Sequence, residues 1–192
     1  MRIRRIAVTG GPGGGKTSLW RELSRAYGER VIAVPEVATL LFQHVFPAVR
    51  NEAERHAVQR AIFHVQRNLE AVHAARSSAD QVLLCDRGTP DGGGYWPHGH
   101  DAFFAAMDAR KEEELARYDA VLFLESAAAG GLSIAAGNPV RVEDVQTAAA
   151  IDRRLREVWS SHPNVCFIAH EREFAVKLAR GVAAVRAWIE QS

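Results

Sequence analysis

A glycine-rich stretch near the N-terminus has the residue types and the spacing of a phosphate-binding loop. Residues 10–17, GGPGGGKT, fit the pattern G-x-x-x-x-G-K-[ST]. Glycines let backbone N–H groups turn around phosphate oxygens, the lysine reaches the β- and γ-phosphates, and the Ser or Thr hydroxyl ligates Mg²⁺. The sequence therefore predicts a nucleoside triphosphate site made by Gly10, Gly11, Pro12, Gly13, Gly14, Gly15, Lys16, Thr17 and Ser18.

The nearest competing motif is the dinucleotide-binding pattern G-x-G-x-x-G. It cannot be fitted to these glycines in any register, so NAD binding is disfavoured. The other alternative is an ordinary glycine-rich turn. The loop instead lies between a predicted strand and an amphipathic predicted helix, whose N-terminal end would direct its positive dipole at the phosphates.

Two carboxylates follow predicted strands, at the edge where open α/β sheets bind their ligands. Asp86 ends the apolar run VLLCD, which is the arrangement that holds Mg²⁺ in P-loop enzymes. Glu36 follows VIAVP and is a candidate general base toward a substrate hydroxyl, or a residue that orients a metal-bound water. The structural alternatives are a helix N-cap for Asp86 and a partner of a helix dipole for Glu36.

Two arginines are candidates for neutralising the charge of a transferred phosphoryl group. Arg87 directly follows Asp86 and could clamp a phosphate or substrate oxygen bidentately, although pairing with a neighbouring acid is the alternative. Residues 126–142 are rich in Ala and Gly and are predicted to form a flap, which would deliver Arg141 on closing. A cation that arrives in this way accelerates phosphoryl transfer by roughly 10³ to 10⁵.

Gln66 and Tyr95 are candidates for binding an acceptor substrate together with Glu36 and Arg87. Gln66, on a long predicted helix, could contact the edge of a base, whereas a solvated helix face is the alternative. Tyr95 lies beside three glycines and could stack on a base or nucleoside. The nearby HGHD at residues 98–101 could bind a metal, but a polar surface loop is the favoured interpretation.

Strand-like and helix-like segments alternate along the chain and must position these residues. Apolar, β-branched runs predict strands at residues 5–9, 31–34, 81–85, 120–124 and 165–169. Helical periodicity predicts helices at residues 16–27, 51–76, 102–117, 143–159 and 171–190, with residues 89–101 as a loop. In the long helix, Asn51 and Glu54 resemble a capping pair. Its buried stripe is expected to contain Val58, Ala61, Ile62, Val65, Leu69 and Val72.

This alternation predicts the α/β class, with a mostly parallel sheet covered by helices on both faces, in a single domain over residues 1–192. The net charge of +1 indicates neither nucleic acid nor an anionic membrane as partner. Both cysteines fall in predicted strands and are expected to be buried and reduced. No apolar run approaches the length of a membrane span, so we expect a cytoplasmic protein.

The chain resembles the small AAA-like ATPase and kinase family. The segments that carry this resemblance are GGPGGGKTSL, VPEVA, LLCDRGTPDGGGYW and NPVRVED, followed by ID, VW and HPN. That family includes the nicotinamide riboside kinase domain and the TRPL-translocation-defect protein. The resemblance covers nearly the whole chain and implies a three-layer P-loop NTPase fold with a sheet of order 2-3-1-4-5. In deoxynucleoside kinases, which the family resembles in fold, a Glu after the second strand serves as base and an acid–Arg pair follows the third. Glu36 and Asp86-Arg87 fall on those positions, whereas residues 126–137 carry no charge, unlike a typical kinase lid.

Together these residues predict a Mg²⁺-dependent phosphotransferase that moves the γ-phosphate of ATP to a nucleoside-like or other small hydroxyl acceptor. The alternative hypothesis is a nucleotide-binding switch or slow NTPase that acts through a protein partner. A P-loop accepts GTP as well as ATP, but the sequence contains no N-K-x-D, which favours ATP. The oligomeric state is not indicated by the sequence.

Overall fold

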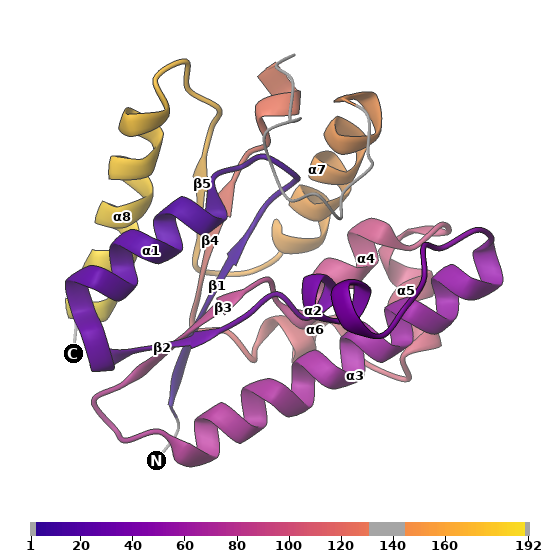
Figure 1. The fold of residues 1–192 in the computed structure, drawn as a ribbon, viewed down its shortest axis with the longest axis horizontal. Helices are drawn as coiled ribbons and strands as arrows, with labels where there is room; N and C mark the ends of the chain where they lie inside the picture. Colours follow the sequence, from indigo (N-terminus) through magenta and orange to yellow (C-terminus); the bar gives the residue numbers. More distant parts are fainter. Residues whose placement is uncertain (1–2, 131–144, 191–192) are drawn as a thin grey trace.

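A five-stranded, all-parallel sheet forms the centre of the computed structural model, which describes residues 3–130 and 145–190 (Figure 1). Its strands are β1 (Arg4–Thr9), β2 (Val31–Val34), β3 (Val82–Asp86), β4 (Ala120–Leu124) and β5 (Val165–Ile168). They lie in the order β2-β3-β1-β4-β5, and every pairing is parallel. The predicted sheet and its order are therefore confirmed.

Helices cover both faces of this sheet. In Figure 1, α1 (Lys16–Tyr27) and α8 (Phe174–Glu190) lie on one face, while α3 (Glu52–Arg76) and α7 (Val145–Trp159) lie on the other. Successive side chains of a strand point to opposite faces. Ile6 and Val8 accordingly pack in the cluster that includes α1 and α8, whereas Ala7 packs in the cluster that includes α7. The shorter elements are η1 (Gly28–Arg30), α2 (Val37–His44), η2 (Thr89–Asp91), α4 (Gly92–Tyr95), α5 (Gly99–Ala106), α6 (Lys111–Leu115) and η3 (Ala127–Gly130).

The single helix predicted over residues 102–117 is wrong, because α5 and α6 replace it with a turn between them. Asp108 in this turn has a φ of 49°, in the left-handed region that a continuous right-handed helix excludes. Asp adopts that region more readily than most residues, since its short polar side chain can hydrogen-bond locally. The break lets Phe103, Phe104 and Met107 pack in one core cluster with Phe63 and Trp96.

The predicted loop over residues 89–101 contains η2, α4 and the start of α5. Its glycines allow close packing: a Cβ on Gly92 would lie 2.4 Å from the Phe103 ring, and one on Gly94 would lie 2.6 Å from Leu155. Sequence patterns assigned this stretch to a loop because glycine weakens isolated helices. Here the tertiary contacts override that propensity.

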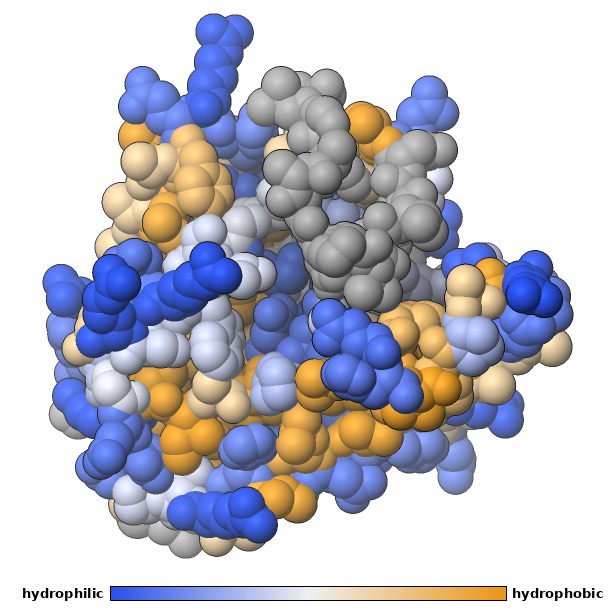
Figure 2. All heavy atoms as spheres, in the orientation of Figure 1, coloured by the Kyte–Doolittle hydropathy of each residue, from blue (hydrophilic) through white to orange (hydrophobic). Residues whose placement is uncertain are grey.

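The buried face of α3 differs from the predicted apolar stripe. Val58 is buried, but Val65 and Val72 are 42% and 47% exposed, and Figure 2 shows apolar residues at the surface over α2 and α3. The buried residues of α3 instead include polar Gln59, Gln66 and Glu70. The predicted cap is confirmed, since the Glu54 N–H donates to Asn51 Oδ1 at 2.9 Å.

Both cysteines are free. Cys85 is fully buried, and burial holds the pKa of its thiol well above the ordinary value, while Cys166 is only partly buried. Among the helices that the structure describes, none combines the length and the apolar character that crossing a bilayer requires.

Shortening a buried side chain in the core should show how strongly the stability of the protein depends on the inner strands of the sheet. Leu83 in β3 is fully buried, and Leu83→Ala should lower the free energy of unfolding by about 2–5 kcal/mol, because it removes packing and leaves a cavity. Leu40 on α2 is 41% exposed, so Leu40→Ala is the matched control and should cost less than about 1 kcal/mol. Urea unfolding measures both, and equal losses would contradict the core assignment.

Candidate nucleotide and acceptor site

The predicted phosphate-binding loop joins β1 to α1 at the carboxyl end of the central strand. Gly10, Gly13 and Gly15 have φ angles of 123°, 73° and 96°, which favour glycine. Space imposes the same requirement, since a Cβ on Gly10 would lie 2.0 Å from the carbonyl oxygen of Leu124 in β4. The glycines therefore let the loop fold tightly against the end of the neighbouring strand.

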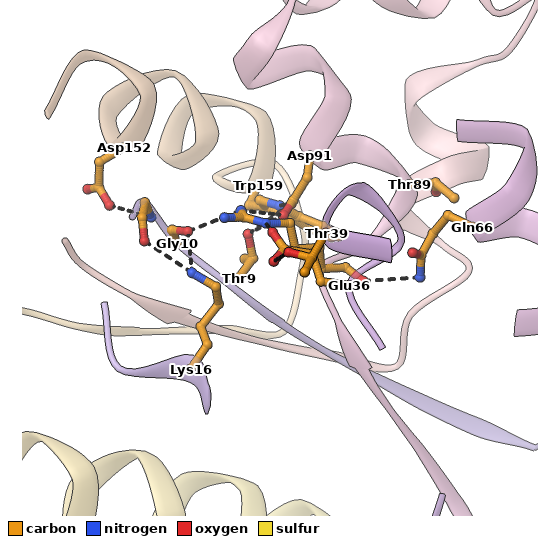
Figure 3. Close-up of polar contacts among 12 residues, drawn as sticks. Thr9, Gly10, Lys16, Glu36, Thr39, Gln66, Thr89, Asp91, Asp152 and Trp159 are labelled. Atoms are coloured by element: carbon orange, nitrogen blue, oxygen red, sulfur yellow. Dashed lines mark hydrogen bonds and ion pairs between the residues drawn. The ribbon is translucent and has the colours of Figure 1, made fainter. Parts of the chain in front are cut away.

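Lys16 is buried and folds back over its own loop (Figure 3). Its Nζ donates to the carbonyl oxygens of Gly10 at 2.9 Å and Gly11 at 3.1 Å. Thr17 follows in the first turn of α1 and is exposed. The ammonium group is thus already held at the loop that is predicted to bind phosphates.

Asp152 on α7 was not predicted as a site residue, but its carboxylate accepts a hydrogen bond from this loop. Its Oδ1 accepts hydrogen bonds from the N–H groups of Gly11 at 2.7 Å and Ser126 at 2.9 Å, and the Ser126 hydroxyl donates to the Pro12 carbonyl oxygen. Burial raises the pKa of Asp152, although the two N–H donors act in the opposite direction. One carboxylate therefore connects the loop, α7 and the segment after β4.

Arg87 lies at the centre of the predicted acceptor side of the site. Its Nε donates to Glu36 Oε1 at 2.6 Å, and its Nη1 donates to Asp91 Oδ2 at 3.1 Å and to the Gly10 carbonyl oxygen at 3.2 Å. Its guanidinium lies 5.5 Å from the ring centroid of Tyr95. Burial alone would lower the pKa of Arg87, but Tyr95, Glu36 and Asp91 outweigh it and hold the pKa well above the ordinary value. Arg87 is therefore a permanent buried cation.

Asp91 is the second residue of the site that we did not predict as a site residue. Its carboxylate accepts hydrogen bonds from the Thr9 hydroxyl at 2.8 Å and from Trp159 Nε1 at 2.5 Å, in addition to the Arg87 contact. These donors come from β1, α7 and the turn after β3. Asp91 belongs to the DRGTPD run of residues 86–91, which carries part of the family resemblance, whereas no sequence pattern indicated the Thr9 and Trp159 contacts.

A small cavity of about 20 Å³, with room for roughly one water molecule, lies beside Arg87. Glu36, Gln66 and Arg87 supply polar groups to its wall, and Phe63 and Phe103 supply aromatic rings. Three of the four predicted acceptor residues thus line one cavity. The fourth, Tyr95, contacts the Arg87 guanidinium and is not among the lining residues.

The buried polar face of α3 forms the support of this cavity. Gln66 Nε2 donates to Glu70 Oε1 at 3.0 Å and to the Arg87 carbonyl oxygen at 3.4 Å. Glu70 is fully buried and also accepts from the Tyr118 hydroxyl and from Arg117 Nη2, each at 2.7 Å. Because buried polar groups need partners, this network explains why polar rather than apolar residues of α3 face inward.

Asp86 and Thr17 are the predicted Mg²⁺ ligands. Asp86 ends β3 and is in register with Val8 of β1, beside the strand that leads into the loop. Thr17 is the second residue of the helix after that loop. Carboxylate and hydroxyl oxygens at this edge of the sheet suit a hard cation such as Mg²⁺. Arg141 and residues 131–142 of the predicted flap lie outside the described residues.

Comparisons with known proteins are consistent with this architecture. A family model described as an AAA domain matches residues 5–175. A solved structure of deoxyadenosine kinase from M. mycoides with bound dATP is similar, with a TM-score of 0.62 and 10% sequence identity, over 95% of this chain and 99% of that chain. Similarity at this level of identity demonstrates a shared fold. Comparison with curated proteins gives no significant match.

Two substitutions at Asp152 should separate its hydrogen bonds from its charge. Asp152→Ala leaves the Gly11 and Ser126 N–H groups without their acceptor, at about 1–3 kcal/mol per buried donor. Asp152→Asn keeps an acceptor oxygen and should retain most of the stability. Urea unfolding of the two variants and the wild type measures the difference.

The pH dependence provides a second test at Asp152. A carboxyl whose folded-state pKa is raised loses stability as the pH rises from its ordinary value of 3.8 through the folded pKa, because the unfolded chain ionises first. The stability of Asp152→Asn relative to the wild type should therefore rise across that window and stay at the higher value above it. A gain that shrinks with rising pH would contradict the assignment.

Proposed function

The chain belongs to the AAA domain family, and we propose that it transfers the γ-phosphate of ATP to a hydroxyl group of a nucleoside-like or other small acceptor. One observation carries this proposal. Arg87 lines the cavity and also donates to the carbonyl oxygen of Gly10 in the phosphate-binding loop. A donor loop and an acceptor cavity joined by a buried cation bring two substrates together and supply positive charge, which phosphoryl transfer requires.

On the donor side, Lys16 and the loop N–H groups bind the phosphates of ATP. Lys16 exchanges its contacts with Gly10 and Gly11 for phosphate oxygens, which are stronger acceptors for an ammonium group. Thr17 and Asp86 would hold Mg²⁺, which would neutralise the negative charge of the phosphates. The proposal favours ATP because the N-K-x-D of guanine-specific proteins is absent from the sequence.

On the acceptor side, Glu36 orients the hydroxyl group and takes its proton. The Glu36 carboxylate accepts from Arg87 Nε through Oε1 and from the Thr39 hydroxyl through Oε2, each at 2.6 Å. A carboxylate oxygen has a second lone pair for the hydroxyl of a bound acceptor. The two existing bonds fix the carboxylate at the cavity wall, which is the positioning that a general base needs.

The aromatic part of the cavity favours a flat acceptor. Phe63 and Phe103 meet edge to face with ring centroids 5.7 Å apart, and Gln66 lies on the same wall. The cavity of about 20 Å³ must widen to admit an acceptor, and aromatic walls with one amide then suit a planar ring that carries polar edge groups, as a nucleoside does. Arg141 is proposed as a second cation over the transferred group, and Tyr95 is proposed to orient Arg87 through the contact between its ring and the guanidinium.

A kinase assay with matched variants tests the proposal. The protein is incubated with ATP, Mg²⁺ and a panel of nucleosides, and phosphorylated products are detected by mass spectrometry. Glu36→Gln should lower kcat by roughly 10² to 10⁴, because it removes the base. The Kd for ATP should stay within a factor of about two, because the side-chain amide oxygen can still accept from Arg87 Nε and so keep the contact between Arg87 and Gly10. Glu22→Gln on the exposed surface of α1 is the control and should keep wild-type kinetics.

The alternative predicts a different result. Tight binding of ATP or GTP without a phosphorylated product from any acceptor would overturn the kinase proposal and favour a nucleotide-binding switch or slow NTPase. Proteolysis within residues 126–137 would then be suppressed more by triphosphate than by diphosphate, since a switch must distinguish the two nucleotides.

A further inference from the structure

A cluster of metal-binding side chain types lies at the N-terminal end of α3, away from the phosphate-binding loop. Glu52 and His56 are one turn apart on α3, and His98 comes from the segment between α4 and α5. His98 Nε2 lies 2.8 Å from Glu52 Oε1, and His56 Nε2 lies 3.6 Å from the same oxygen. One ligand atom from each residue lies within 4.8 Å of the other two.

Trp96 holds His56 in a defined orientation. The two rings stack with their centroids 4.1 Å apart and their planes at 9°, and Trp96 is buried. Within the part of the chain that the structure describes, His56 Nε2 is buried and has no hydrogen-bond partner. A buried imidazole nitrogen without a hydrogen bond is costly unless something else binds it, and neutral imidazole is a common metal ligand.

From this geometry we propose that Glu52, His56 and His98 bind a divalent transition-metal ion, and that Zn²⁺ is the best match. Tetrahedral zinc with ligand bonds of about 2.0–2.2 Å places its ligand atoms roughly 3.3–3.5 Å apart. The two separations from Glu52 Oε1, 2.8 and 3.6 Å, lie on either side of that value, and the ligand atoms of His56 and His98 lie within 4.8 Å of each other. Side-chain rotations that bring the two imidazoles to the same ion would complete the site.

The ligand chemistry distinguishes this site from the proposed Mg²⁺ site. Two imidazoles and one carboxylate suit zinc, whereas Mg²⁺ prefers oxygen ligands. Three protein ligands leave one position for water or for an external ligand.

The bound ion would connect two walls of the acceptor cavity. Phe63 and Gln66 lie further along α3 from His56, while Gly92 lies on α4 and Phe103 on α5, on either side of His98. In Figure 1 the N-terminal end of α3 lies beside α5. Zinc held at this end would therefore restrain the two walls relative to each other. The inference does not depend on the proposed kinase activity, because metal binding is measured without nucleotide or acceptor.

Metal titration of the full chain tests this proposal. The protein is treated with a chelator, freed of it, and titrated with ZnCl₂ by calorimetry. One zinc ion should bind per chain, and His56→Ala and His98→Ala should each weaken binding by more than about 100-fold, because losing a ligand exceeds the usual effect of losing an outer-shell partner. His64→Ala removes an exposed histidine of the same helix and should leave the zinc Kd unchanged.

Two further measurements distinguish a loss of zinc binding from a folding defect in the variants. His98 has a side chain that is 62% exposed, so His98→Ala should keep the wild-type circular dichroism spectrum and melting temperature in the absence of metal. A hundredfold excess of zinc over its Kd should raise the Tm of the wild type by roughly 5–10 °C and leave that of His98→Ala unchanged.

A spectroscopic readout locates the ion. Cu²⁺ bound at this site should quench the fluorescence of Trp96, which stacks on His56, and Trp96→Phe should remove that part of the quenching. The proposal is overturned if zinc fails to bind, or if it binds with the same Kd in wild type, His56→Ala and His98→Ala. In either case the cluster is an ordinary pairing of histidines with Glu52.

Discussion

The buried guanidinium of Arg87 is the constraint on which the rest of this structure depends. A charge removed from water is tolerated only when it is paired and hydrogen-bonded, since an uncompensated buried charge costs several kcal/mol. The partners come from three places: Glu36 after β2, Asp91 after β3 and the Gly10 carbonyl oxygen after β1. Because β2, β3 and β1 are neighbours, one cation connects the carboxyl ends of three adjacent strands.

This constraint extends into the local backbone. Arg87 has a φ of 74°, a conformation that costs a non-glycine residue roughly 1–2 kcal/mol. The contacts of its side chain offset that cost, and the resulting turn directs the guanidinium back toward the phosphate-binding loop. Strained backbone of this kind is concentrated at functional sites, where surrounding contacts over-determine it. The residue with the strained backbone conformation, Arg87, thus also lines the cavity.

On the donor side, the carboxylate of Asp152 connects separate parts of the chain, as the guanidinium of Arg87 does on the acceptor side. Asp152 accepts N–H groups from the phosphate-binding loop and from Ser126, so the position of α7 is connected to the shape of the loop. Trp159, the last residue of α7, donates to Asp91. One helix therefore contacts both halves of the proposed site, and a shift of α7 would affect the donor loop and the support of Arg87 together.

The sequence by itself determined the features that depend on neighbouring residues. The loop at Gly10 to Thr17 is a local pattern, the Asn51–Glu54 cap spans three residues, and apolar runs mark all five strands within about one residue. Parallel strands carry the residues that follow them to one edge of the sheet, so Glu36 and Arg87 could be predicted to meet. The contact between them at 2.6 Å is what that rule implies.

The tertiary structure decided which partners come from distant parts of the chain. Gly11 and Asp152 are 141 positions apart, and nothing local to Asp152 indicates that its carboxylate accepts from a loop N–H. Contacts with distant parts of the chain also explain which face of α3 is buried. The apolar pattern favoured burial of Val65 and Val72, but Gln66 and Glu70 are buried instead. Periodicity identifies a helix, whereas the groups packed against it determine which face is buried, and here those groups are polar. Hydrogen-bond partners that the fold brings together therefore decided what the residue pattern could not.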